Sequence, residues 1–256
     1  MRLRILIAAL AVTATALLTF ALTGTGALDI GQRKAVEEVV RAYLQENPEV
    51  VIEAIRAFQA KEEQAAKDRA QVNLAARRDE LENDPSSPVG GNPDGNVTIV
   101  EFFDYRCGFC KEVLPTVMAL MKEDPNIRYV FKEFPILGPQ SVVASRAAQA
   151  AWRVDKDKYM AFHTALMENR GSLPESKVMT LAAASGYDVE GLRQAMADPE
   201  IEAILRRNLQ LADSLNIGGT PTFVIGNRLF PGAITADVLN DVVADARAAC
   251  QKTGVC

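Results

Sequence analysis

Two cysteines, Cys107 and Cys110, stand three positions apart between an apolar run and an amphipathic segment. The mostly apolar residues 97–103 predict a buried strand, and residues 107–123 predict a helix. Cys107 would then lie at a helix start, where unpaired N–H groups and the helix dipole stabilise a thiolate. Cys110 follows one turn later on the same side. This arrangement predicts a thiolate that attacks a disulfide and a second thiol that resolves the mixed disulfide.

The segments after this helix predict an α/β domain with a helical insert. A second strand is expected over residues 127–134, and a helical block over 141–215. Residues 222–225 and 228–230 predict a hairpin around Gly226-Asn227, and a last helix is expected over 235–250. We therefore assign residues 96–256 to one domain, with an insert at about 139–216.

The segment before this domain predicts a helical extension over residues 28–83. Val36, Val39, Val40 and Tyr43 follow helical spacing, and a further apolar stripe follows Asn47-Pro48. Helices this short have little interior of their own, so their apolar faces need a partner. Either the main domain or a second copy of the chain could provide it. A turn-rich stretch over residues 84–95 is expected to be the linker and the domain boundary.

Residues 1–27 are typical of an export signal. Arg2 and Arg4 precede a mostly apolar run, and small residues follow it. The run is long for a signal peptide and nearly long enough to cross a bilayer as a helix. We favour cleavage over retention as a membrane anchor, and either outcome places the body of the protein outside the cytoplasm, in a periplasm-type compartment.

Charge excludes two classes of partner. The formal charge of the 256 residues is −5, and no basic stripe is present to bind nucleic acid or anionic lipid. No nucleic acid is expected as a partner, and no cofactor is expected.

A second motif, Gly219-Thr220-Pro221-Thr222, stands just before the predicted hairpin. With the run from Val100 to Lys111 and the helical insert, it resembles the DsbA family of thioredoxin-fold proteins over about residues 86–250. The resemblance implies a thioredoxin fold with an inserted helical domain, Cys107 as nucleophile and Cys110 as resolving thiol. It also implies that Pro221 is a cis-proline beside the redox-active Cys107–Cys110 pair, and that Thr220 offers its backbone to a substrate.

Two departures from the DsbA oxidase pattern favour isomerase or reductase activity. Gly108 and Phe109 supply no charge or side-chain donor between the cysteines, so the thiolate is less stabilised and the disulfide less oxidising. Thr220 also resembles the disulfide isomerases more than the oxidases, which usually have Val there. A dithiol oxidase is the alternative. The expected substrates are proteins with cysteines or disulfides, and a membrane redox partner is expected to exchange electrons with the site.

The N-terminal segment from Ala42 to Val51 resembles the oligomerising extension of suppressor-of-copper-sensitivity C proteins. This resemblance implies a homo-oligomer assembled through the N-terminal helices. Isomerisation benefits from such assembly, because a held substrate meets several thiols at high effective concentration.

Glu101 stands six residues before Cys107, inside the first apolar strand. It is either a solvent-facing residue or a partly buried carboxylate of raised pKa that takes the proton from Cys110. The DsbA family has an acid at this spacing, and we favour the second role. Lys132 is expected either to pair with Glu101 or to lie at the surface.

Cys250 and Cys256 near the chain end predict a structural disulfide, with a second redox pair as the alternative. Metal binding at Cys107 and Cys110 is a rival hypothesis. Zinc is disfavoured, because the other cysteines are not spaced as a second Cys-x-x-Cys and His163 is the only histidine. Copper(I) suits two thiolates better. Met118 and Met121 lie on the following helix, but methionines at helical spacing are more often core residues. A redox-inert protein that keeps the fold is a third hypothesis. We assign no chemistry to His163 or Trp152.

Overall fold

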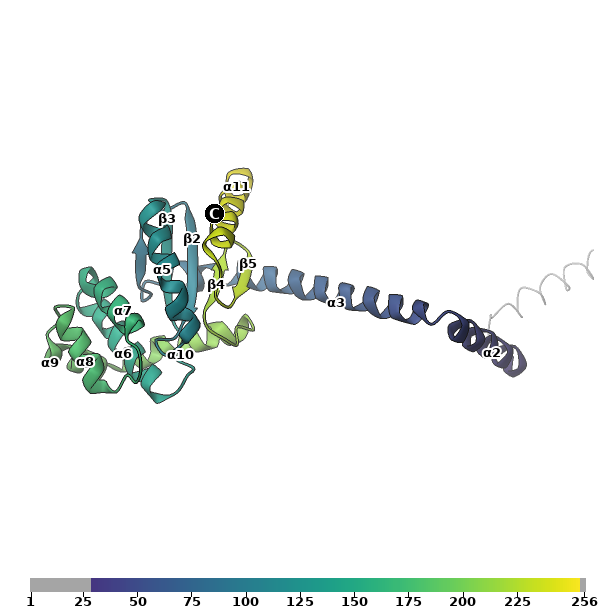
Figure 1. Ribbon diagram of the computed structural model, residues 1–256, viewed down its shortest axis with the longest axis horizontal. Helices are drawn as coiled ribbons and strands as arrows, with labels where there is room; N and C mark the ends of the chain where they lie inside the picture. Colours follow the sequence, from purple (N-terminus) through teal and green to yellow (C-terminus); the bar gives the residue numbers. More distant parts are fainter. Residues whose placement is uncertain (1–28, 254–256) are drawn as a thin grey trace, which may run out of the picture. The chain divides into compact units, whose positions relative to one another are not determined.

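Five strands form one mixed sheet in the order β1-β3-β2-β4-β5 (Figure 1). The computed structural model describes residues 29–253, so the predicted signal segment 1–27 lies outside the described residues. β2 pairs with β3 in parallel, and the other three pairings are antiparallel. The strands are β1 (Val89–Gly91), β2 (Val97–Phe103), β3 (Ile127–Glu133), β4 (Thr222–Ile225) and β5 (Arg228–Pro231).

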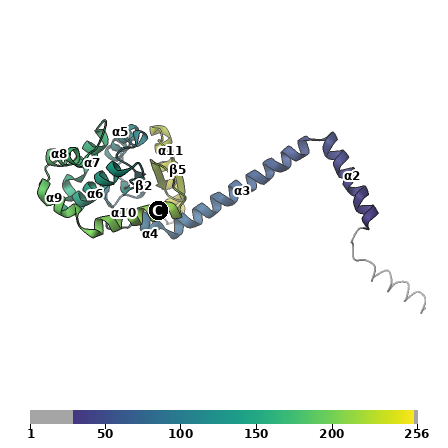
Figure 2. The ribbon, with the colours of Figure 1, turned by 90° about the horizontal axis from the view of Figure 1, so that it is seen from below.

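Helices cover both faces of this sheet. α5 and α11 pack on one face, and α4 and α10 pack on the other. The helices α6 to α9 gather beside the sheet between β3 and α10 in the chain (Figure 1, Figure 2). The helices of this part are α4 (Arg78–Glu82), α5 (Gly108–Glu123), α6 (Pro139–Val154), the short 3₁₀ helix η1 (Lys156–Lys158), α7 (Tyr159–Glu168), α8 (Glu175–Ala184), α9 (Val189–Met196), α10 (Pro199–Ser214) and α11 (Ala236–Thr253).

The alternation of side chains along β2 explains the two cores of this layered structure. Ile99 and Phe103 point to the α5 face and join the larger cluster of buried residues. Val100 and Phe102 point to the opposite face and pack against residues of α4 and α10. A strand buried on both faces reads as a continuous apolar run, which is the pattern of residues 97–103. The strand–helix–strand order followed by an antiparallel hairpin and a helix is the predicted thioredoxin fold with inserted helices.

The N-terminal residues form two helices, α2 (Ile30–Glu46) and α3 (Glu49–Ala76). Asp29 and Gln32 form a capping box at the start of α2, which satisfies backbone N–H groups that the first turn leaves unpaired. The chain divides into two units, one up to Gln64 and one from Ala65 onward. The division falls within α3 rather than at the predicted linker.

Part of the predicted linker, residues 84–95, packs against the sheet. Val89–Gly91 forms β1, which pairs with β3, and Phe131 donates a backbone hydrogen bond of 2.9 Å to Pro88 O. Leu74 and Leu81, which precede this stretch, are buried in the core on the α4 face. These contacts join residues 74–91 to the sheet, and the unit from Ala65 onward contains all of them.

Candidate active site

Cys107 caps the start of α5, directly after the turn that follows β2. The backbone N–H of Cys110 donates a 3.3 Å hydrogen bond to Cys107 Sγ, which is the contact expected of a thiolate at a helix start. A hydrogen bond from the side chain of Cys110 is the largest effect that lowers the pKa of Cys107, to about 6, and burial opposes it. Cys107 is therefore negatively charged in most molecules of the reduced protein at neutral pH.

Cys110 is the more deeply buried member of the pair. It is 1% exposed and Cys107 is 5% exposed, and burial raises the pKa of the Cys110 thiol far above the ordinary value. Both cysteines are free thiols in this structure. The two sulfurs thus differ strongly in acidity, which separates a reactive thiolate from a protonated neighbour within one helical turn.

The loop before β4 lies against the nucleophile. The Thr220–Pro221 peptide bond is cis, as the resemblance implied. Cys107 Sγ lies 3.2 Å from Thr220 O, to which the protonated thiol donates a hydrogen bond, although the two residues are 113 positions apart. Pro221 is buried and Thr220 is partly exposed. The structure therefore brings Cys107, Thr220 and Pro221 together at one end of the sheet.

Glu101 is buried on the sheet face that α5 covers. Its side chain accepts a 2.7 Å hydrogen bond from Tyr129 OH. Burial raises the pKa of Glu101 to about 7, and the Tyr129 hydrogen bond opposes that shift. The carboxylate charge of Glu101 also adds to the effect of burial in raising the pKa of Cys110. Glu101 is 3% exposed, so the alternative of a solvent-facing residue does not hold.

Lys132 differs from both expectations. Residues 101 and 131 are paired across β2 and β3, so the side chain of Lys132 points to the opposite face from Glu101. Lys132 is 1% exposed, and its Nζ donates to Glu80 O at 2.6 Å and to Asp84 Oδ2 at 3.0 Å. Lys132 therefore neither pairs with Glu101 nor lies at the surface. It attaches residues 80–84 to the sheet.

Asp104 is a site residue that the sequence analysis missed. It is fully buried, and its two carboxylate oxygens accept hydrogen bonds from the backbone N–H groups of Arg106 and Leu137, at 2.7 and 2.9 Å. Cys107 N donates to Asp104 O at 3.0 Å. Asp104 thus holds the turn that carries Cys107 against the loop after β3. The sequence shows an acidic residue directly between the predicted strand and the two cysteines. It does not show that this residue would contact Leu137, which lies 33 positions later.

Exposed apolar side chains lie in the dithiol turn and in the loop after β3. Phe109 is 62% exposed, and Ile136 and Leu137 are also exposed. Arg106 Nη1 donates a 2.7 Å hydrogen bond to Leu137 O, which fixes the loop that carries them. These side chains offer an apolar surface to a polypeptide that approaches Cys107.

His163, Trp152, Met118 and Met121 lie in or against the protein core. His163 is buried among aromatic rings and lies 3.0 Å from Tyr105 OH through Nδ1, and Trp152 packs edge-on to Tyr159. Met118 and Met121 pack against the main core. Cys250 is disulfide-bonded, and Cys256, its predicted partner, lies outside the described residues. Among residues 29–253, no three side chains of His, Cys, Asp or Glu gather as metal ligands would.

The fold and the paired cysteines define a thioredoxin-fold dithiol protein. Residues 98–244 match the DSBA-like thioredoxin domain family, to which the chain belongs. Residues 32–65 match the Copper resistance protein ScsC N-terminal domain.

Solved structures show the same relationships. A thioredoxin-like oxidoreductase from Silicibacter pomeroyi is 45% identical, with a TM-score of 0.64, over 67% of this chain and 98% of that chain. A linker-deletion mutant of Proteus mirabilis ScsC is 29% identical, with a TM-score of 0.68, over 88% of this chain and 100% of that chain. The second match extends over the N-terminal helices as well as the catalytic unit.

One relative of known name is a much longer protein than this chain. A Na(+)/H(+) antiporter NhaA 1 of Salinispora arenicola is 30% identical over 160 residues, which are 62% of this chain and 24% of the antiporter. The chain thus spans about a quarter of that relative's length. None of the helices within residues 29–253 combines the length and the apolar character that a membrane crossing needs.

Proposed function

We propose that this protein is an exported thiol–disulfide oxidoreductase that acts on protein disulfides and works mainly as an isomerase or reductase. The observation that carries the proposal is the contrast between Cys107, with a pKa of about 6, and the buried, protonated Cys110 beside it. Thiols of this kind attack disulfides near neutral pH because the thiolate is the nucleophile.

The geometry supports a two-step exchange. The Cys107 thiolate attacks one sulfur of a substrate disulfide, which breaks the S–S bond, forms a mixed disulfide and releases the other sulfur as a thiolate. Cys110 then loses its proton to Glu101 and attacks Cys107 Sγ. The new Cys107–Cys110 disulfide forms as the second substrate thiolate leaves, so the substrate is reduced by two electrons and the protein is oxidised.

Isomerisation needs only the first step of this exchange. A thiol of the substrate itself attacks the mixed disulfide and displaces Cys107, so no net oxidation occurs. Thr220 offers its backbone carbonyl beside the sulfur, and Phe109 offers an apolar contact to an extended chain. The pKa of about 6 for Cys107 lies between about 3.5 in DsbA, a strong oxidant, and about 7 in thioredoxin.

Reactivation of a protein with scrambled disulfides tests this proposal. We expect the protein to restore activity to scrambled ribonuclease, and Cys107→Ser to be inactive. Cys110→Ala should retain the first step and accumulate the mixed disulfide, which mass spectrometry detects. Rapid oxidation of dithiols without any repair of scrambled bridges would instead favour the alternative function, a dithiol oxidase.

A second candidate function is copper(I) binding by the same two thiols. Its support is the pair of free cysteines together with the match of residues 32–65 to a domain named for copper resistance. Two thiolates suit this soft ion. Titration of the reduced protein with copper(I) in the presence of a strong chelator tests it. Successful competition that Cys107→Ser abolishes would support this candidate, whereas no competition would eliminate it.

We further propose that α2 and the first part of α3 assemble the protein into a homo-oligomer. Large apolar side chains are exposed along these helices, and such a surface is unfavourable in water unless a partner covers it. They are Val36, Val39, Val40, Tyr43, Val51, Ile52, Ile55 and Phe58. A second copy of the chain is the partner that the match to the ScsC N-terminal domain favours.

Light scattering on matched chains tests this assembly. We expect a chain that begins at Ala65 to be a folded monomer, and Ile55→Lys to weaken assembly of the full chain. Glu53→Lys is the control, because Glu53 is a polar residue of the same helix. If the chain from Ala65 has the association state of the full chain, the extension does not assemble the protein.

Export and a membrane redox partner complete the proposal. The support for export is the charge and apolar pattern of residues 1–27. After each reduction of a substrate, a partner that supplies electrons is needed to return the Cys107–Cys110 disulfide to two thiols. Cell fractionation with N-terminal sequencing tests export and cleavage, and the redox state of the pair in cells without candidate membrane thiol carriers tests the partner.

A further inference from the structure

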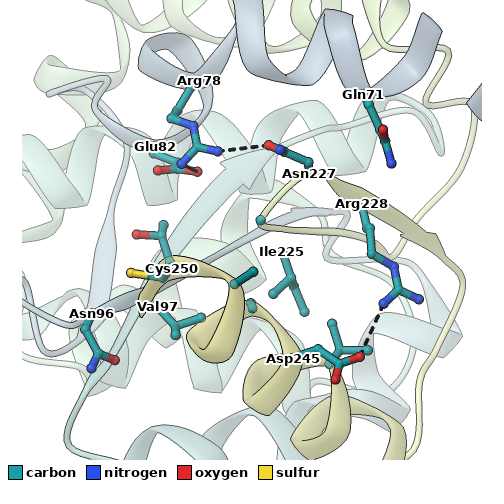
Figure 3. Close-up of a pocket in the computed structure, with 15 residues that line it drawn as sticks. Gln71, Arg78, Glu82, Asn96, Val97, Ile225, Asn227, Arg228, Asp245 and Cys250 are labelled. Carbon is teal, nitrogen blue, oxygen red and sulfur yellow. Dashed lines mark hydrogen bonds and ion pairs between the residues drawn. The ribbon is translucent and has the colours of Figure 1, made fainter. Parts of the chain in front are cut away.

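A pocket lies at the other end of β2 from the dithiol. It has a volume of about 520 Å³ and opens between the end of α3, α4, the β4–β5 turn and α11 (Figure 3). Val97 and Thr98, at the start of β2, line it, whereas Cys107 follows the end of that strand. The pocket is therefore separate from the redox site, and its volume lies within the range of small-molecule sites in proteins.

Small residues create this hollow. Ala246 and Ala249 of α11 face it where larger side chains would fill the space, and Val242 lies one turn earlier. Gly226 in the β4–β5 turn has a φ of +57°, and a Cβ there would lie 3.9 Å from Ala246 Cβ. Ile225 stands in the middle of the view in Figure 3. The floor of the pocket is thus apolar and shaped by aliphatic side chains.

The charged side chains at the rim of the pocket form ion pairs of opposite charge. Arg78 Nη1 lies 3.9 Å from Glu82 Oε1, and Arg228 Nη1 lies 3.7 Å from Asp245 Oδ2. Two arginines and two carboxylates line the pocket, so the rim carries no net formal charge. An ionic ligand would lose hydration on entry and would gain little from such a balanced rim.

Amide groups supply the uncharged polar contacts. Arg78 Nη2 donates a 2.9 Å hydrogen bond to Asn227 Oδ1. Because arginine only donates, this contact fixes the amide orientation and leaves Asn227 Nδ2 as a donor. Gln71 of α3 and Asn96, just before β2, contribute two further amides (Figure 3). These groups could orient one hydrogen-bonding atom of a ligand.

We propose that this pocket binds an uncharged, mostly apolar small molecule with a single hydrogen-bonding group. The apolar floor supplies the affinity, the amides orient the ligand, and the balanced rim disfavours anions and cations. This site is independent of the thiol chemistry at Cys107.

A matched pair of fluorescent probes tests the proposal on the full chain. N-phenyl-1-naphthylamine is neutral, and 1-anilinonaphthalene-8-sulfonate has the same ring body with an added sulfonate. We expect saturable binding of the neutral probe at one site per chain, and at least about tenfold weaker binding of the sulfonate, a difference of about 1.4 kcal/mol. Equal or tighter binding of the sulfonate would overturn the assigned ligand class.

Variants of α11 locate the site. Ala249→Leu would fill the pocket and should abolish the saturable binding. Ala244→Leu adds the same side chain to an exposed position of the same helix outside the pocket, and should bind as the wild type does. Thermal unfolding of both variants verifies folding. If the wild type shows no saturable binding, or if Ala249→Leu binds normally, the pocket is not the site.

Discussion

Tyr129 donates a 2.7 Å hydrogen bond to Glu101 from the neighbouring strand, and both side chains are buried. A phenol stabilises an ionised carboxylate, yet burial outweighs it and the pKa of Glu101 rises to about 7. Glu101 therefore changes its charge within the pH range in which thiol exchange takes place. A carboxylate with a pKa near neutrality can accept a proton from Cys110 at neutral pH, and it stays protonated at lower pH.

Glu101 should make the protein less stable as the pH rises. Its pKa in the folded protein lies above the unfolded value of 4.5, so the stabilising protonated form is fully present below pH 4.5 and is lost as the pH rises through about 7. A difference of this size corresponds to about 3 kcal/mol of unfolding free energy.

Urea unfolding of wild type and Glu101→Gln measures this effect. Relative to the wild type, the variant should gain about 3 kcal/mol between pH 4.5 and pH 8, because Gln does not ionise. Glu53→Gln, an exposed substitution of the same kind, should show no such gain. A constant difference between Glu101→Gln and the wild type across this pH range would contradict the raised pKa.

His163 should have the opposite pH dependence. Burial lowers its pKa to about 3, so the neutral ring contributes stability that is present above pH 6.5 and is lost as the pH falls toward 3. The expected slope is about 1.4 kcal/mol per pH unit over this interval. His163→Gln should remove this slope from the unfolding free energy.

Tyr105→Phe is the control for the histidine. It removes the hydroxyl that lies 3.0 Å from His163 Nδ1 but leaves the titrating ring in place, so the acid slope should persist. Unfolding free energies measured at intervals between pH 3 and pH 7 distinguish the two variants. An unchanged slope in His163→Gln would show that other groups cause the acid sensitivity.

The pair formed by Lys132 and Asp84 should contribute to the attachment of residues 80–84. Asp84→Ala leaves a buried ammonium group without its carboxylate, which costs about 3 kcal/mol of unfolding free energy. Adding Lys132→Met to this variant should recover part of the loss, because the uncompensated charge is gone. A double-mutant cycle by urea unfolding measures the coupling, and strictly additive effects would show that the pair is not coupled.

Local patterns in the sequence predicted the elements next to the dithiol. The bounds of β2 agree with the apolar run 97–103, and α5 begins one residue after the expected start because Cys107 is its cap. The start and end of β2 and the start of α5 depend on residues that are close in the sequence. Hydrophobic periodicity and helix-capping patterns can therefore predict them.

Features that depend on distant residues could not be predicted in this way. The sequence of Val89–Gly91 is typical of a turn, yet its hydrogen-bonded pairing with β3 makes it a strand. The error over Lys132 arose because the register of β2 on β3, and not proximity in sequence, decides which face a side chain takes. The contact of Asp104 with Leu137 likewise exists only once the loops meet.

The central claim is that Cys107 is a thiolate near neutral pH because Cys110 and the start of α5 donate hydrogen bonds to it. The direct measurement is the rate of Cys107 alkylation against pH in the reduced protein, with Cys107→Ser to identify the signal. We predict a midpoint near pH 6, and a higher midpoint in Cys110→Ala. A midpoint at or above about 8.5, the pKa of an ordinary thiol, would contradict the account.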